Sequence, residues 1–135
     1  MIERTLAIIK PDAVKAKYSG KIIDHIEQEG FTILGMKKLQ LTTAQAESFY
    51  AVHKERGFFR ELVTFMVSGP VIVMALEKDN AIAAWRDLMG PTDPAQAPAN
   101  TIRKLYGASK GENATHGSDA AATAAEEIKF FFPEL

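Results

Sequence analysis

The amino-acid sequence predicts an α+β sandwich, in which a four-stranded antiparallel sheet carries helices on its faces. Two observations lead to this class: short β-branched runs alternate with segments whose apolar residues recur at helical spacing, and Gly, Pro and Asn separate them. Of the 135 residues, 47% are hydrophobic and 24% are charged, which is typical of one globular domain spanning residues 1–135. The formal net charge is −1 and cysteine is absent, which excludes disulfides and thiolate metal sites and makes nucleic acid an unlikely partner.

Five elements are expected in the first half of the chain. Gly30 is placed to end the first helix, and Gly35 indicates a bulge or bend in the strand that follows. Thr42 and Gln45 have the spacing of a capping box, which announces another helix. In order, we expect a strand at 5–9, a helix at 19–29, a strand at 31–41, a helix from 42 to 50 and a helix at 58–67.

The second half continues with a wholly apolar strand, a helix and a long loop. Asn80 is the expected N-cap of the helix and Gly90 its terminator. Residues 91–113 hold three prolines and are expected to be a functional loop. We expect a strand at 71–76, a helix at 80–89, a short segment at 115–117 and a helix from 118 or 119 to 128. Two βαβ-like halves in this order are typical of a ferredoxin-like βαββαβ sandwich.

No stretch of the chain is apolar for long enough to cross a membrane. The longest clean apolar run covers residues 71–76, whereas a membrane span needs roughly 20 such residues. The first residues lack the basic region and apolar core of a secretory signal. We therefore expect a cytoplasmic protein.

The segment 113–119 contains a histidine that is either a catalytic residue or a polar loop residue. His116 lies among small and polar neighbours, before a helix whose free N–H groups would favour a phosphate. Imidazole is largely neutral at pH 7, so a ring nitrogen can attack phosphorus without a separate base. A carboxylate about two turns along the helix, from Glu126 or Glu127, could orient the ring. Periodicity alone does not choose between these two residues.

Other candidates for nucleotide binding are scattered along the sequence. Ser19-Gly20-Lys21 is not a phosphate loop, because it lacks the earlier Gly and the following Ser or Thr. Phe58 is either a core anchor or an exposed plate on which a base stacks. His25 and His53 are expected at the solvated surface. Four cations lie at element ends or in loops: Lys10, Arg56, Arg86 and Arg103. Each of them, taken alone, is more typical of the solvated surface than of a binding site.

The segment 113–119 resembles the active-site signature N-x-x-H-G-S-D of nucleoside diphosphate kinases. Similar blocks follow the family's order along the chain, at residues 3–6, 9–13, 49–50, 54–59, 68–70, 86–90, 92–95 and 101–103. The resemblance implies a ferredoxin-like fold and a ping-pong kinase. Such an enzyme passes the γ-phosphoryl of a nucleoside triphosphate to a histidine and then to a nucleoside diphosphate, with broad tolerance of base and sugar.

The resemblance also implies roles for individual residues. His116 would be the nucleophile through Nδ1, oriented by Glu127 with help from Ser118. Phe58 and Leu62 would enclose the base without reading its edges, which explains the broad tolerance. The residues that would surround the phosphates and sugar are Lys10, Tyr50, Arg86, Thr92, Arg103, Asn113 and, near the β-phosphate, Arg56.

The resemblance further implies a cofactor and an assembly. Mg²⁺ would arrive with the nucleotide, bridge its phosphate oxygens and reach Asp119 only through water, since this ion keeps part of its water shell. Family members are homo-tetramers or homo-hexamers built from dimers, and the sequence does not choose between them.

Four positions depart from the family's usual residues: Asn100, Leu105, Lys110 and Ala120. Asn100 stands where Gly is common and could adopt the same left-handed turn. Leu105 and Lys110 bear on loop packing, subunit contacts and affinity for particular bases. Two other functions are open at this stage: a non-catalytic nucleotide-binding or regulatory module on the same fold, and a scaffolding protein.

Overall fold

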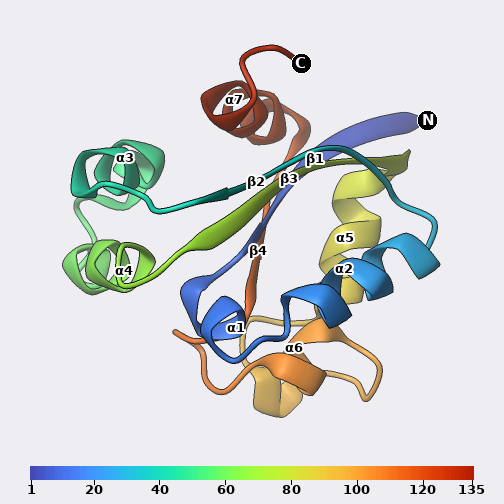
Figure 1. The fold of residues 1–135 in the computed structure, drawn as a ribbon, viewed down its shortest axis with the longest axis horizontal. Coiled ribbons are helices and arrows are strands. Elements are labelled where there is room, and N and C mark those ends of the chain that lie inside the picture. The colour runs from blue at the N-terminus through green and yellow to red at the C-terminus, as the bar shows by residue number, and fades with distance from the viewer.

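Four strands form one antiparallel sheet in the order β2-β3-β1-β4 (Figure 1). The computed structural model describes residues 1–135, except for the side chain of Val52. The strands are β1 (Ile2–Ile9), β2 (Thr32–Leu39), β3 (Val71–Asp79) and β4 (Thr115–Gly117). The central pair β1 and β3 is in register from Ile2 opposite Asp79 to Ile9 opposite Ile72. This arrangement confirms the predicted ferredoxin-like α+β class.

Helices cover both faces of the sheet (Figure 1). One face packs against α3 (Thr43–Phe49), α4 (Phe59–Met66) and α7 (Ala121–Phe131). The other face packs against α1 (Pro11–Lys15), α2 (Ser19–Gln28), α5 (Ala81–Met89) and α6 (Ile102–Tyr106). Two 3₁₀ turns, η1 (Ala51–His53) and η2 (Pro94–Gln96), complete the chain's elements.

Strand β1 explains why both faces need a cover. Its side chains alternate between the faces, so Leu6 and Ile8 enter one apolar cluster while Ala7 and Ile9 enter the other. All four are fully buried. A central strand with apolar residues on both sides is stable only when helices remove both surfaces from water.

The predicted bulge and capping box are both present. Pairing between β2 and β3 shifts between Ile33 and Gly35. A Cβ on Gly35 would lie 2.9 Å from Cε1 of Phe132, so glycine lets this ring approach the strand. At the start of α3, the side chain of Thr42 accepts from the Gln45 N–H and that of Gln45 accepts from the Thr42 N–H.

Asn80 occupies the predicted N-cap position of α5, but its side chain does not cap the helix. Asn80 adopts a left-handed conformation with φ 53°, and its side chain makes no capping bond. Instead, Oε1 of Glu3 accepts from the Ile82 N–H at 3.2 Å. The tight turn from β3 uses asparagine for its backbone conformation, and strand β1 supplies the cap from the neighbouring position in the sheet.

The segment 91–128 also differs from the prediction. It contains η2 and α6, and Thr101 caps α6 by accepting from the Lys104 N–H at 3.3 Å. Asn100 does not adopt the left-handed turn, since Lys17, Asn80 and Ala114 are the described non-glycine residues with positive φ. Helix α7 begins at 121 rather than 118 or 119, because 115–117 pair with β1 and the chain needs three further residues to turn.

Among the described residues, no helix combines the length and the apolar character that crossing a membrane requires.

Candidate active site

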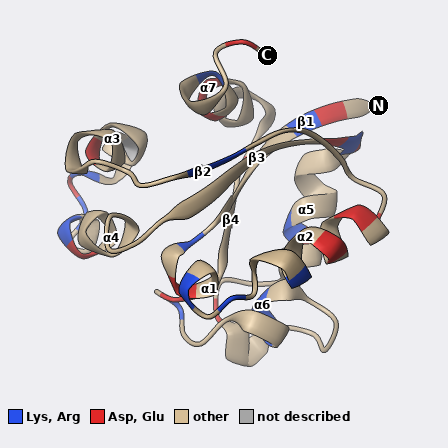
Figure 2. Ribbon diagram, in the orientation of Figure 1, with Lys and Arg blue, Asp and Glu red and all other residues tan. Residues whose placement is uncertain are grey.

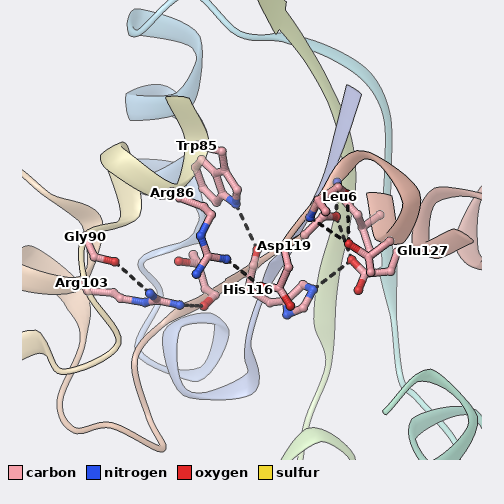
Figure 3. A network of polar contacts seen from close by, with 12 residues as sticks. Leu6, Trp85, Arg86, Gly90, Arg103, His116, Asp119 and Glu127 are labelled. Carbon is pink, nitrogen blue, oxygen red and sulfur yellow. Dashed lines mark hydrogen bonds and ion pairs between the residues drawn. The ribbon is translucent and has the colours of Figure 1, made fainter. Parts of the chain in front are cut away.

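His116 lies on the short edge strand β4, where the sheet meets the segment after α6. It pairs with Ile8 of β1, and its carbonyl oxygen accepts from Nε1 of Trp85 at 3.1 Å (Figure 3). Gly117 makes room for this indole, since an added Cβ would lie 2.6 Å from Cδ1 of Trp85. The backbone of His116 is therefore fixed by the sheet on one side and by α5 on the other.

The imidazole of His116 is oriented by a carboxylate from α7. Its Nε2 lies 3.2 Å from Oε1 of Glu127, and the same oxygen accepts from Oγ of Ser118 at 2.8 Å (Figure 3). Oγ of Ser118 in turn accepts from the Leu6 N–H at 3.1 Å. A carboxylate accepts hydrogen bonds, so Nε2 carries the proton and Nδ1 keeps its lone pair. Of the two carboxylates that periodicity left open, Glu127 is the one that reaches the ring.

Lys10 and Asn113 join the end of β1 to the segment before β4. Nζ of Lys10 donates to Oδ1 of Asn113 at 2.9 Å, and the Asn113 amide donates to the Thr92 carbonyl at 3.1 Å. Ala114 has a left-handed φ of 75°, which is costly for a non-glycine residue. Its N–H donates to Oδ2 of Asp12, and its carbonyl accepts from the Lys10 N–H. These bonds hold the turn that delivers His116.

Arg103 and Arg86 bring positive charge to the same place. Arg103 is buried and donates to the carbonyls of Gly90 and Thr115 at 2.9 and 3.0 Å. Arg86 donates to Oδ1 of Asp119 at 2.9 Å in a largely exposed pair (Figure 3). Figure 2 shows that Lys and Arg are otherwise dispersed over many elements. Because the net charge of the chain is close to zero, an anion is attracted only where cations lie close together, as Arg86 and Arg103 do here.

Burial changes the ionisation of several groups in the site. The pKa of Lys10 is lowered to about 8, mainly by burial and to a smaller extent by the nearby Arg103 guanidinium. The carboxylate of Asp12 acts in the opposite direction. Burial and then Arg86 lower the pKa of Arg103 to about 10. Burial and then the charge of Glu127 raise the pKa of the Tyr50 hydroxyl. A bound anion would favour the charged forms of Lys10 and Arg103.

A cavity of about 1100 Å³ opens in front of His116. The sequence-predicted residues on its wall are Lys10, Tyr50, Phe58, Leu62, Arg86, Thr92, Arg103, Asn113, His116, Asp119 and Glu127. Ser118 is fully buried and acts on the site through Glu127. Arg56 does not line this cavity either; it lines a neighbouring hollow of about 460 Å³ together with Lys54 and Arg60.

Phe58, a residue that is 47% exposed, lies on the cavity wall together with Leu62, one turn along α4. His53 is not the solvated surface residue that the sequence suggested. It is half-buried on the cavity wall, its Nδ1 is buried, and its ring lies 5.8 Å from that of Phe58 and 6.5 Å from that of Tyr50. The sequence signal that could have found it is its position between these two aromatic residues.

The site as a whole brings a histidine, two buried cations and an exposed phenylalanine ring together on the wall of one cavity. A family model described as nucleoside diphosphate kinase matches residues 3–135. The chain belongs to the nucleoside diphosphate kinase family. Nucleoside diphosphate kinases named from Geotalea daltonii and Sorangium cellulosum are 63% and 60% identical over 134 and 131 residues. These matches cover 99% and 97% of this chain and 98% and 91% of the two relatives.

Solved structures of nucleoside diphosphate kinases have the same fold. The kinase from Aquifex aeolicus superposes with a TM-score of 0.96 at 47% identity, covering 98% of this chain and 96% of the other. A halophilic nucleoside diphosphate kinase from Halobacterium salinarum, solved in complex with CDP, gives a TM-score of 0.94 at 38% identity and covers 98% and 88%. This chain is accordingly an enzyme of the nucleoside diphosphate kinase type.

Proposed function

We propose that this kinase works by a ping-pong mechanism through a phosphohistidine at position 116. The hydrogen bond between Nε2 of His116 and Glu127 carries the proposal, because it leaves the lone pair of Nδ1 for the substrate. Nδ1 attacks the γ-phosphorus of a nucleoside triphosphate, the N–P bond forms and the nucleoside diphosphate leaves. A second nucleoside diphosphate then takes the phosphoryl group, and the free imidazole returns.

The cations around His116 support binding of the phosphates. Lys10 uses one of its three amine N–H groups on Asn113, so two are available to phosphate oxygens. Arg86 can exchange its exposed carboxylate partner for a phosphate, and Arg103 adds charge from a fixed position. In this proposal Thr92, Asn113 and Tyr50 complete the surroundings of the phosphates and sugar. Arg56 would reach the β-phosphate from the edge of the neighbouring hollow.

The apolar end of the cavity supports tolerance of different bases. Phe58 offers an exposed ring on which any base can stack, and Leu62 lies beside it. Stacking on a π-face gives affinity without reading the hydrogen-bonding edge of the base. Ribo- and deoxynucleotides with different bases would therefore serve as donors and acceptors.

Magnesium fits the site as a partner of the nucleotide. Among the described residues, no three acidic or histidine side chains gather around one cation position, so the ion would be held through phosphate oxygens. Asp119 would contact its water shell, since its carboxylate is exposed beside the cavity. When bound, Mg²⁺ neutralises charge on the transferring phosphate.

The proposal extends to the state of the protein in the cell. We propose that residues 1–135 act as one domain, that copies assemble as a tetramer or hexamer built from dimers, and that the protein works in the cytoplasm beside its nucleotide pools. Light scattering on the purified chain measures the assembly directly, and a monomer would contradict this part of the proposal.

Phosphoryl labelling tests the mechanism. Purified chain mixed with γ-labelled ATP and Mg²⁺ should carry a label that is stable in alkali and lost in acid. His116→Ala should abolish both the label and turnover, while His25→Ala, which removes a histidine from the middle of α2, should retain both. A chain that binds nucleotide without becoming labelled would instead be the non-catalytic module.

A further inference from the structure

One hydrogen bond leaves the imidazole of His116 incompletely fixed. The bond from Nε2 to Glu127 sets one point of the ring, but the ring can still tilt about that point. Transfer to phosphorus needs the Nδ1 lone pair in line with the bond that breaks. Some other group must therefore restrict the tilt.

The ring of Phe49 touches the imidazole from the end of α3. Its centroid lies 5.5 Å from that of His116, and the two planes meet at 70°, which is an edge-to-face arrangement. Tyr50 lies further away, at 6.2 Å and 88°. Phe49 is half-buried and lies on the wall of the same cavity.

Phe49 is itself held from several sides. Its ring packs on Tyr50 at 4.9 Å, on Phe131 at 5.2 Å and on Phe130 at 5.6 Å. Phe130 and Phe131 stand three and four residues after Glu127, so all three lie on adjoining parts of the α7 surface. Phe49 thus packs against the helix that carries the carboxylate as well as against the imidazole that this carboxylate orients.

We infer that Phe49 is a positioning residue for the phosphoryl transfer, which fixes the tilt of the His116 ring so that Nδ1 faces the bound phosphate. This inference rests on the proposed function. Phe49 has no exchangeable side-chain proton and no charge, so it takes no part in proton or phosphoryl transfer itself. Its effect is confined to the orientation of the ring and of α7 behind it.

The test replaces the ring while keeping the apolar volume. Phe49→Leu should lower the single-turnover rate of His116 phosphorylation by roughly 3- to 10-fold, the range expected from one aromatic pair. The dissociation constant for ADP should change by less than about 2-fold, because Phe49 does not carry the phosphate cradle. Phe49→Tyr keeps the ring and should restore the rate to within about 2-fold of the unmodified chain.

Phe132→Leu is the matched control. Phe132 belongs to the apolar cluster on the same face of the sheet, but it does not line the cavity, and among the described side chains its ring makes no contact with that of His116. Its rate and affinity should stay within about 2-fold of the unmodified chain. A rate for Phe49→Leu equal to that for Phe132→Leu would overturn the inference, as would a parallel loss of ADP affinity.

A nuclear magnetic resonance measurement separates this inference from the proposed function. Long-range ¹H–¹⁵N spectra of the His116 ring should show one tautomer, with the proton on Nε2, and Phe49→Leu should broaden or average these signals. An unchanged ring spectrum in Phe49→Leu would refute the positioning role. If the unmodified chain takes up no label, the proposed mechanism fails, whereas the ring spectra still decide whether Phe49 orients the imidazole.

Discussion

Replacing Gly117 by alanine should disturb both the stability of the protein and its nucleophile. The added Cβ would lie 2.6 Å from Cε of Met89 and 2.6 Å from Cδ1 of Trp85. Carbon atoms in contact normally lie about 3.5–4.0 Å apart, so at least one neighbour must move by about 1 Å. Met89 and Trp85 are buried in the core, so any movement of theirs must be taken up by other close-packed side chains.

The size of the effect follows from overpacking. Forcing an extra methyl group into a packed core costs about 1–3 kcal/mol of the free energy of unfolding. For a chain of this length, 1 kcal/mol corresponds to roughly 3.5 °C, so the unfolding midpoint should fall by about 4–11 °C. The indole also donates to the His116 carbonyl at 3.1 Å, so its displacement moves His116, the proposed nucleophile. We expect kcat to fall by up to about 100-fold.

Thermal unfolding at fixed protein concentration and steady-state transfer from ATP to a nucleoside diphosphate measure the two effects. Gly20→Ala is the matched control, because nothing lies within 4 Å of an added Cβ on Gly20 in α2. That variant should be as stable as the unmodified chain or more stable, by up to about 1 kcal/mol, with unchanged kcat. If Gly117→Ala keeps both its midpoint and its kcat, the close packing around Gly117 does not constrain the site.

Three further outcomes follow from other contacts. Ser118→Ala should lower the free energy of unfolding by about 1–3 kcal/mol, measured by chemical denaturation, because the buried Leu6 N–H loses its acceptor. A stability equal to the unmodified chain would mean that this N–H finds another partner. Glu3→Ala should cost about 0.5–1 kcal/mol in the same measurement, since it removes the cap on the Ile82 N–H, and no loss would contradict the capping role. Lys10 loses its proton above about pH 8, so the KM for nucleotide should rise there, and Lys10→Arg should remove this rise. A KM that stays constant through pH 9 would contradict the proposed phosphate contact. Lys10 also affects the free energy of unfolding. Because its pKa is lowered in the folded state, the unfolded state binds more protons between pH 8 and 10.5, so the contribution of Lys10 to the free energy of unfolding increases with pH across that window.

Local sequence patterns predicted those parts of the fold that depend on nearby residues. The capping box at Thr42, the bulge at Gly35 and the apolar run of β3 are each encoded within a few residues, and each is present. The segment around His116 was also recognisable, because its small neighbours and the spacing N-x-x-H-G-S-D lie in one stretch of chain.

Such local patterns could not predict contacts between segments that are distant in the sequence. Asn80 stands at the predicted N-cap position of α5, but the side chain that accepts from the first turn of the helix belongs to Glu3, 79 residues before its partner Ile82. The buried face of α7 is set by Ile128 and Phe131 against the sheet, and this packing turns Glu127 toward His116. His53 was placed at the surface because its sequence neighbours are charged, whereas its ring lies beside Tyr50 and Phe58.

The sequence by itself determined the α+β class and singled out His116 as the candidate nucleophile, because hydrophobic periodicity, turn residues and a compact motif are short-range properties. The assembly of the site depended on the tertiary structure. Lys10 meets Asn113 across 103 residues and Leu6 meets Ser118 across 112, since the sheet places β1 beside β4. Packing of two helical layers on that sheet then fixes which carboxylate, which aromatic ring and which buried cations surround the imidazole, and no local pattern contains that information.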